Sequence, residues 1–134
     1  VLAIDEANRV ARVETGITAL AQNSDPFTYF AKQPIHVCED IAIDDGHLAM
    51  ILLQRANQLD MLNVVPRLLT KKLSAYKHGQ VIHFDEMLEA ELKSVSTDES
   101  GEVRPFPVQV DGDYIGEFDQ VRLKAAPGAL TIIA

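Results

Sequence analysis

The chain has 134 residues, 47% of them hydrophobic and 24% charged, and a formal net charge of −8 at pH 7. This length suits one domain with its own core, and the excess of carboxylates argues against nucleic acid as a partner, because binding a phosphate backbone requires clustered Lys and Arg. A single cysteine, Cys38, excludes an intramolecular disulfide, and no apolar run approaches the roughly 18 residues of a membrane span.

Short apolar runs recur along the first half of the chain, and turn-forming residues end each of them. We expect strands in the ranges 1–5, 10–13, 17–22, 35–43 and 48–53. The clearest breaks are Asn-Ser-Asp-Pro at 23–26 and Asp-Asp-Gly at 44–46. Runs of this length between turn signals are typical of β-strands.

One helix is predicted, over residues 59–73. Its leucines and valine recur at helical spacing, so that they share one face. Asn57 is suited to cap its start, and Pro66 is expected to kink the helix or to begin a second one.

The segment 87–95 combines helical composition with a strand pattern. Its Glu, Met, Leu and Ala residues favour helix, but Leu88, Ala90 and Leu92 alternate with charged residues at period two. Alternation of this length between strands predicts a strand with these three side chains on its buried face.

The end of the chain carries two further strand signals. Alternating apolar runs flank Asp111-Gly112 over 107–117, a pattern that predicts a β-hairpin and that the residues alone explain as a turn. A second run follows at 126–133. Together these elements predict a mainly β fold, an antiparallel β-sandwich with one helical excursion at 59–73, as a single domain over 1–134.

Four segments together resemble the carboxy-terminal domain of the diacylglycerol kinase and sphingosine kinase-like lipid kinases, in particular bacterial members of actinobacterial type. In chain order these segments are QNSDPFTYF at 22–30, IAIDDGHL at 41–48, the leucine-rich segment with LNVVPRLL, and FPVQVDGDYIGE followed by PGAL. Each is weak alone, and their order and spacing carry the resemblance.

The resemblance implies an ATP-dependent transfer of the γ-phosphate to the hydroxyl of diacylglycerol or a similar lipid, as part of phospholipid metabolism. Asp111 resembles the proposed general base of the family, and Asp113 stands where a glutamate is usual. The family binds MgATP mainly on a Gly-Gly-Asp-Gly-Thr loop of an amino-terminal α/β domain, and neither this loop nor a P-loop occurs here. The chain is therefore expected to be the carboxy-terminal part of a two-domain enzyme, inactive when isolated.

The resemblance also implies a structural Mg²⁺ held by Asp44, Asp45 and the backbone carbonyl of His47. Adjacent carboxylates and a carbonyl suit a hard cation. Relatives that hold the ion often have an acid where this chain has Ala42, so one ligand is missing. A tight turn between two strands is the alternative.

The aromatic residues Phe27, Tyr29 and Phe30 are candidates for lining the lipid cleft, with an ordinary core role as the alternative. The expected partners are the lipid alcohol and the amino-terminal domain, in the cytoplasm, with a transient contact at the inner membrane surface left open. The rival interpretation is a non-catalytic β-sandwich module that binds a lipid or a protein, in which both Asp-Gly pairs are only turns.

Overall fold

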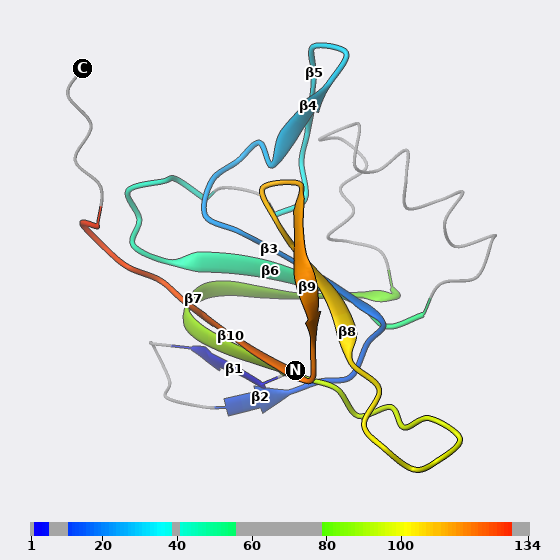
Figure 1. Ribbon diagram of the computed structural model, residues 1–134. Helices are drawn as coiled ribbons and strands as arrows, with labels where there is room; N and C mark the ends of the chain where they lie inside the picture. The colour runs from blue at the N-terminus through cyan, green and yellow to red at the C-terminus, as the bar shows by residue number, and fades with distance from the viewer. Residues whose placement is uncertain (1, 6–10, 39–40, 56–78, 130–134) are drawn as a thin grey trace.

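The computed structural model describes residues 2–5, 11–38, 41–55 and 79–129, which form strands and connecting turns without a helix (Figure 1). The strands are β1 (Leu2–Asp5), β2 (Ala11–Val13), β3 (Thr18–Gln22), β4 (Thr28–Phe30), β5 (Gln33–Ile35), β6 (Leu48–Leu53), β7 (Val81–Lys93), β8 (Phe106–Val110), β9 (Asp113–Phe118) and β10 (Gln120–Lys124). The prediction of a mainly β, antiparallel fold is confirmed. The helix predicted over 59–73 lies outside the described residues. Across these same ranges, no helix is long and apolar enough to cross a membrane.

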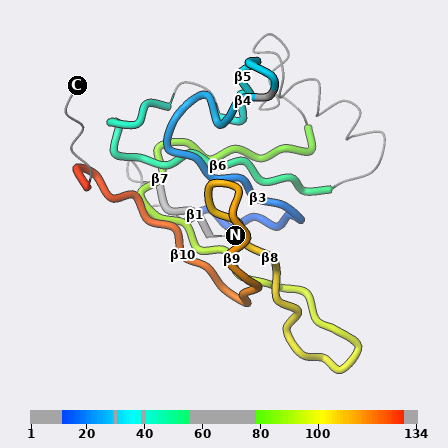
Figure 2. Tube along the Cα trace, turned by 45° about the horizontal axis from the view of Figure 1, so that its top comes forward, coloured from blue at the N-terminus to red at the C-terminus, as the bar shows by residue number. Residues whose placement is uncertain are grey.

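Six strands form the main sheet, in the order β2-β1-β7-β6-β3, with β10 also paired to β7. Glu91 of β7 is opposite Leu2 of β1 and also opposite Arg122 of β10, so β1 and β10 use opposite edges of β7. Arg122 reinforces its edge through contacts of 3.3 Å with Glu89 and Glu91. The pairs β4–β5 and β8–β9 are separate two-stranded sheets that stand apart from this order (Figure 2).

Strand β7 is the central strand of the main sheet, and two irregularities in its pairing bend it. Leu48 pairs with Met87 but Met50 pairs with Phe84, so β7 has an extra residue there, and Glu86 has a φ of 51°. A second register shift lies between the partners of Met87 and Glu89. Bulges bend a strand and increase its twist. The 13-residue β7 can therefore pair with β6, β1 and β10 along its length while the sheet curls.

Each face of the curled sheet buries its own apolar cluster. The first cluster consists of Met50, Leu52, Phe84, Met87 and Ala90. The second consists of Val37, Cys38, Ile41, Ala49, Ile51 and Val81. Alternate residues of β6 belong to different clusters because successive side chains of a strand point to opposite faces. Two buried faces explain why β6 is apolar throughout instead of alternating with polar residues.

The strand predicted over 87–95 is confirmed as far as Lys93, despite its helical composition. Ala90 is fully buried in the first cluster and Leu92 packs against it, as the alternation predicts. Leu88 is only half-buried, and Met87, which the pattern did not select, is 1% exposed. The register shift beside Leu88 is the physical reason, because one extra residue reverses which side chains face the core.

This bulge makes a testable difference between neighbouring residues. Met87→Ala should lower the free energy of unfolding by about 2–5 kcal/mol, because it empties a fully buried site. Leu88→Ala should lower it clearly less, because Leu88 is half-buried. Urea denaturation of both variants measures the difference. A larger loss for Leu88 would contradict the register of β7.

Candidate functional site

The β8–β9 hairpin turns at Asp111 and Gly112, as the sequence predicts. Both residues have positive φ, 51° and 91°, which is the geometry of a two-residue type I′ turn. Glycine adopts it without strain, and Asp is among the residues that tolerate it best. The right-handed twist of the flanking strands favours this turn, so the local sequence is sufficient to specify it.

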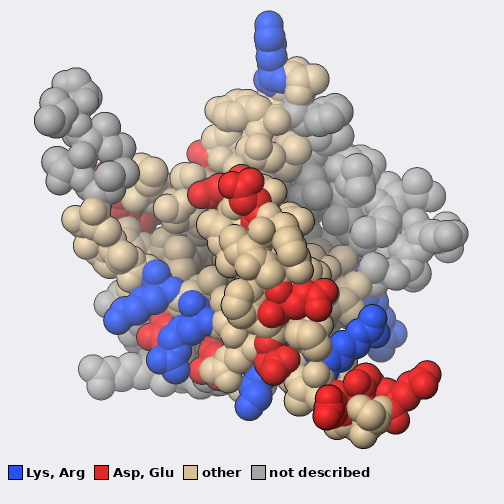
Figure 3. All heavy atoms as spheres, in the orientation of Figure 1, with Lys and Arg blue, Asp and Glu red and all other residues tan. Residues whose placement is uncertain are grey.

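The turn presents two carboxylates to solvent. Asp111 lies at its apex and Asp113 pairs with Val110 directly behind it, and both side chains are exposed. Figure 3 shows acidic side chains gathered at this end of the hairpin. Below the turn, a register shift at Ile115 separates the Gln109–Tyr114 pair from the pairs nearer the base. Carboxylates placed in this way are open to a substrate brought by another domain or surface.

The turn at 44–46 is stabilised by the side chain of Asp45, one of its own residues. The backbone N–H of Ala42 donates to Oδ2 of Asp45 at 2.7 Å, and the N–H of Asp45 donates back to the carbonyl of Ala42 at 3.2 Å. Gly46 then takes a φ of 75°. Asp and Gly suit this geometry, because an Asp side chain can replace a backbone hydrogen bond in a turn.

The predicted Mg²⁺ site is only partly supplied by this turn. Asp44 and Asp45 are exposed, but one carboxylate oxygen of Asp45 already accepts the hydrogen bond from Ala42. In the part of the chain that the structure describes, no three His, Cys, Asp or Glu side chains converge as metal ligands. Hard cations take six or more oxygen ligands. The metal at Asp44, Asp45 and the carbonyl of His47 stays a prediction on which the chemistry proposed here does not depend.

The same turn contacts the turn that follows β10. A Cβ built on Gly46 would lie 3.2 Å from Cγ and 3.3 Å from Cβ of Pro127. The Asp-Asp-Gly and Pro-Gly segments, which lie far apart in sequence, therefore pack directly against each other. Two of the four segments that carry the family resemblance meet in space at this point.

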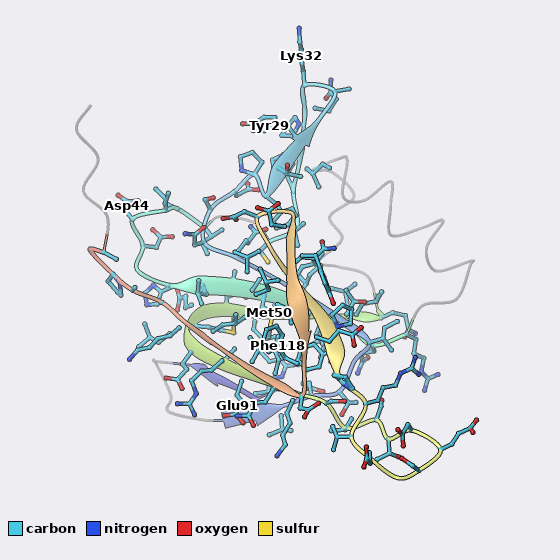
Figure 4. All side chains as sticks on the ribbon, viewed as in Figure 1. Tyr29, Lys32, Asp44, Met50, Glu91 and Phe118 are labelled. Atoms are coloured by element: carbon cyan, nitrogen blue, oxygen red, sulfur yellow. The ribbon has the colours of Figure 1, made fainter. Side chains whose placement is uncertain are left out.

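The candidate lipid-binding aromatic residues lie on the projecting β4–β5 hairpin. Phe27 and Tyr29 are 43% and 65% exposed, so they do not serve as core residues. The side chain of Phe30 lies outside the described part. Figure 4 shows Tyr29 and Asp44 on separate projections of the molecule. The three candidate groups therefore lie on three different loops.

A buried polar cluster lies beneath the β4–β5 hairpin, and the sequence did not reveal it. Nδ1 of His36 lies 2.7 Å from Oδ1 of Asp25, and both side chains are about nine-tenths buried. Nε2 of Gln22 donates to the carbonyl of Cys38 at 3.0 Å. These partners are separated by more than ten residues, so no local spacing predicts them.

Cys38 is not a candidate nucleophile. Burial raises the pKa of its thiol to about 12, with smaller contributions from the negative charges of Asp85 and Asp25. A thiol is nucleophilic only as the thiolate. Near neutral pH, Cys38 therefore acts as a small apolar member of the second cluster.

Comparisons of the chain with protein-family models, with curated proteins and with solved structures found no match.

The contact between Gly46 and Pro127 can be tested by adding one methyl group. Gly46→Ala should lower the free energy of unfolding by about 1–2 kcal/mol, because Ala is strained at positive φ and its Cβ crowds Pro127. Gly101→Ala is the matched control, since its φ of 86° carries similar strain but nothing lies within 4 Å of a Cβ there. Equal stability of the two variants in urea would show that the turn does not depend on this packing.

Proposed function

We propose that this chain is the acceptor-binding β-domain of a lipid kinase of the diacylglycerol kinase type. The observation that carries the proposal is the exposed pair Asp111 and Asp113 at the tip of the β8–β9 hairpin. A general base has to reach a hydroxyl that another molecule brings, and an apex of this kind satisfies that requirement.

The proposed reaction assigns one step to this chain. The hydroxyl oxygen of the lipid bonds to the γ-phosphorus of ATP, the bond from that phosphorus to the bridging oxygen of ADP breaks, and the hydroxyl proton passes to the carboxylate of Asp111. Asp113 is the second exposed carboxylate at this tip, directly after the Asp111-Gly112 turn. Positioning MgATP and stabilising charge on its phosphates supply most of the catalysis in this class and belong to a nucleotide-binding domain outside this sequence.

Two further features support the proposal. The packing of Gly46 against Pro127 joins two of the segments on which the family resemblance rests. The exposed Phe27 and Tyr29 offer apolar surface to a lipid substrate. For such an enzyme we infer a cytoplasmic location with access to the inner membrane surface, where its lipid alcohol resides.

The alternative is a non-catalytic module that binds a lipid or a protein. It is favoured by exposed apolar side chains on the β8–β9 hairpin, where Val110, Tyr114 and Ile115 are each more than half exposed. The coding sequence upstream of residue 1 discriminates between the two. A Gly-Gly-Asp-Gly-Thr loop there supports the kinase, whereas an unrelated domain supports the module.

Asp111→Asn tests the assigned base in the protein encoded by the whole gene. Asn suits the same turn geometry but cannot take up the proton, so turnover of lipid and MgATP should fall by about 10²–10⁴-fold with the melting temperature unchanged. Asp119→Asn is the matched control, because it removes one exposed carboxylate at the end of the same hairpin and should leave turnover near normal.

Near-normal turnover of Asp111→Asn would leave Asp111 as a turn former only. A parallel fall in melting temperature would be equally damaging, because misfolding would then explain the lost activity.

A further inference from the structure

The β4–β5 hairpin is a separate projection with an apolar, solvent-exposed surface. Its strands pair only with each other among the described strands, and its tip is Ala31-Lys32, with φ values of 45° and 70°. Figures 1 and 4 show it standing away from the main sheet, with Lys32 pointing outward from the tip. Tyr29 is 65% exposed on one of its strands.

The base of this hairpin is firmly held. The N–H of Phe27 donates to the carbonyl of Ile35 at 2.9 Å, and the N–H of Asp25 donates to the carbonyl of Ile41 at 3.0 Å. The buried contact between His36 and Asp25 lies at the same base. The exposed aromatic side chains therefore lie on a hairpin whose base is hydrogen-bonded to the rest of the fold.

The charge of the β4–β5 hairpin differs from that of the rest of the chain. Residues 26–37 contain no Asp or Glu and one lysine, within a chain of net charge −8. The β8–β9 hairpin is the useful contrast, since its exposed Tyr114 lies among Asp111, Asp113 and Glu117. Aromatic side chains with a nearby cation are what protein segments at the lipid headgroup level carry, whereas carboxylates are repelled there.

The length of the β4–β5 hairpin separates its tip from the rest of the chain, which is acidic. At about 3.3 Å per residue, the strand from Phe27 to Ala31 reaches roughly 13–16 Å. The Debye length at physiological ionic strength is roughly 8 Å, so the charge of the rest of the chain is largely screened at the tip. Lys32 and Tyr29 therefore decide what the tip attracts, although the chain as a whole is acidic.

We propose that the β4–β5 hairpin is an interfacial anchor that inserts Tyr29 among the headgroups of an anionic bilayer, with Lys32 beside the lipid phosphates. The proposal goes beyond the lipid kinase assignment and does not rest on it, because the exposure and charge of this hairpin do not depend on the reaction assigned to Asp111. It commits to a membrane surface and not to a second copy of the chain.

A tryptophan probe tests insertion directly, because the chain contains no Trp. Tyr29→Trp should shift its emission to shorter wavelength, and lose intensity to brominated lipid, when vesicles of equal phosphatidylcholine and phosphatidylglycerol are added. Tyr114→Trp is the matched control at a similarly exposed tyrosine and should show neither change. Unchanged emission of Tyr29→Trp, or equal responses of both probes, would overturn the proposal.

Vesicle sedimentation gives an independent readout on the same protein. Tyr29→Ser should weaken partition onto these vesicles about tenfold or more, because it removes the aromatic surface that enters the interface. Tyr114→Ser should bind as the unsubstituted chain does, and Lys32→Gln should weaken binding to the anionic vesicles but not to pure phosphatidylcholine.

Self-association is the competing outcome. A concentration-dependent increase in mass without vesicles, abolished by Tyr29→Ser, would mean that a second copy covers the hairpin and would overturn the membrane proposal. If circular dichroism shows that Tyr29→Ser is unfolded, the two Trp variants and Lys32→Gln still test membrane binding. The Trp variants keep an aromatic residue at their positions, and Lys32→Gln keeps a polar residue of similar size.

Discussion

The constraint on which this structure depends is the bent course of β7. One strand pairs with β6 over its first half and with β1 and β10 over its second half, and two bulges let it do so while the sheet curls. Bulges remove a ladder hydrogen bond, yet they allow Phe84, Met87 and Ala90 to face one core although their spacing of three residues does not fit the period of two of a regular strand. A straight strand of the same sequence would place Met87 on the opposite face from Phe84 and Ala90.

Because the curled sheet takes up β1–β3, β6, β7 and β10, two hairpins remain outside it. Neither β4–β5 nor β8–β9 supplies members of the first buried cluster, and both expose apolar side chains. They differ in charge: β8–β9 has carboxylates at its tip, and β4–β5 has a lysine. This division suits one hairpin that acts on a substrate hydroxyl and another that meets the membrane holding the substrate.

Several local features were predictable from the sequence and the non-local ones were not. The strand predicted over 35–43 was wrong, because β5 ends at Ile35 and the described residues 36–38 and 41–47 belong to no strand. The Asp111-Gly112 hairpin follows from two residues and their flanking runs, and the alternation in 87–93 correctly outweighed helical composition, because buried pairing partners on both edges stabilise a strand. The sequence did not predict that Met87 replaces Leu88 in the core, because partner strands set the register. Contacts such as Gly46 with Pro127 depend on distant segments in the same way. The sequence indicated the aromatic residues as candidates but not their exposure, which depends on the fold of the β4–β5 hairpin.

Transfer of phosphate to lipid is the most direct test of the central claim that this domain presents an acceptor alcohol to MgATP. The protein encoded by the whole gene would be incubated with MgATP and vesicles containing diacylglycerol, and its products separated by chromatography. The account predicts phosphatidic acid and ADP formed in equal amounts. ATP consumption without a phosphorylated lipid, or no product from diacylglycerol and related lipid alcohols alike, would contradict it.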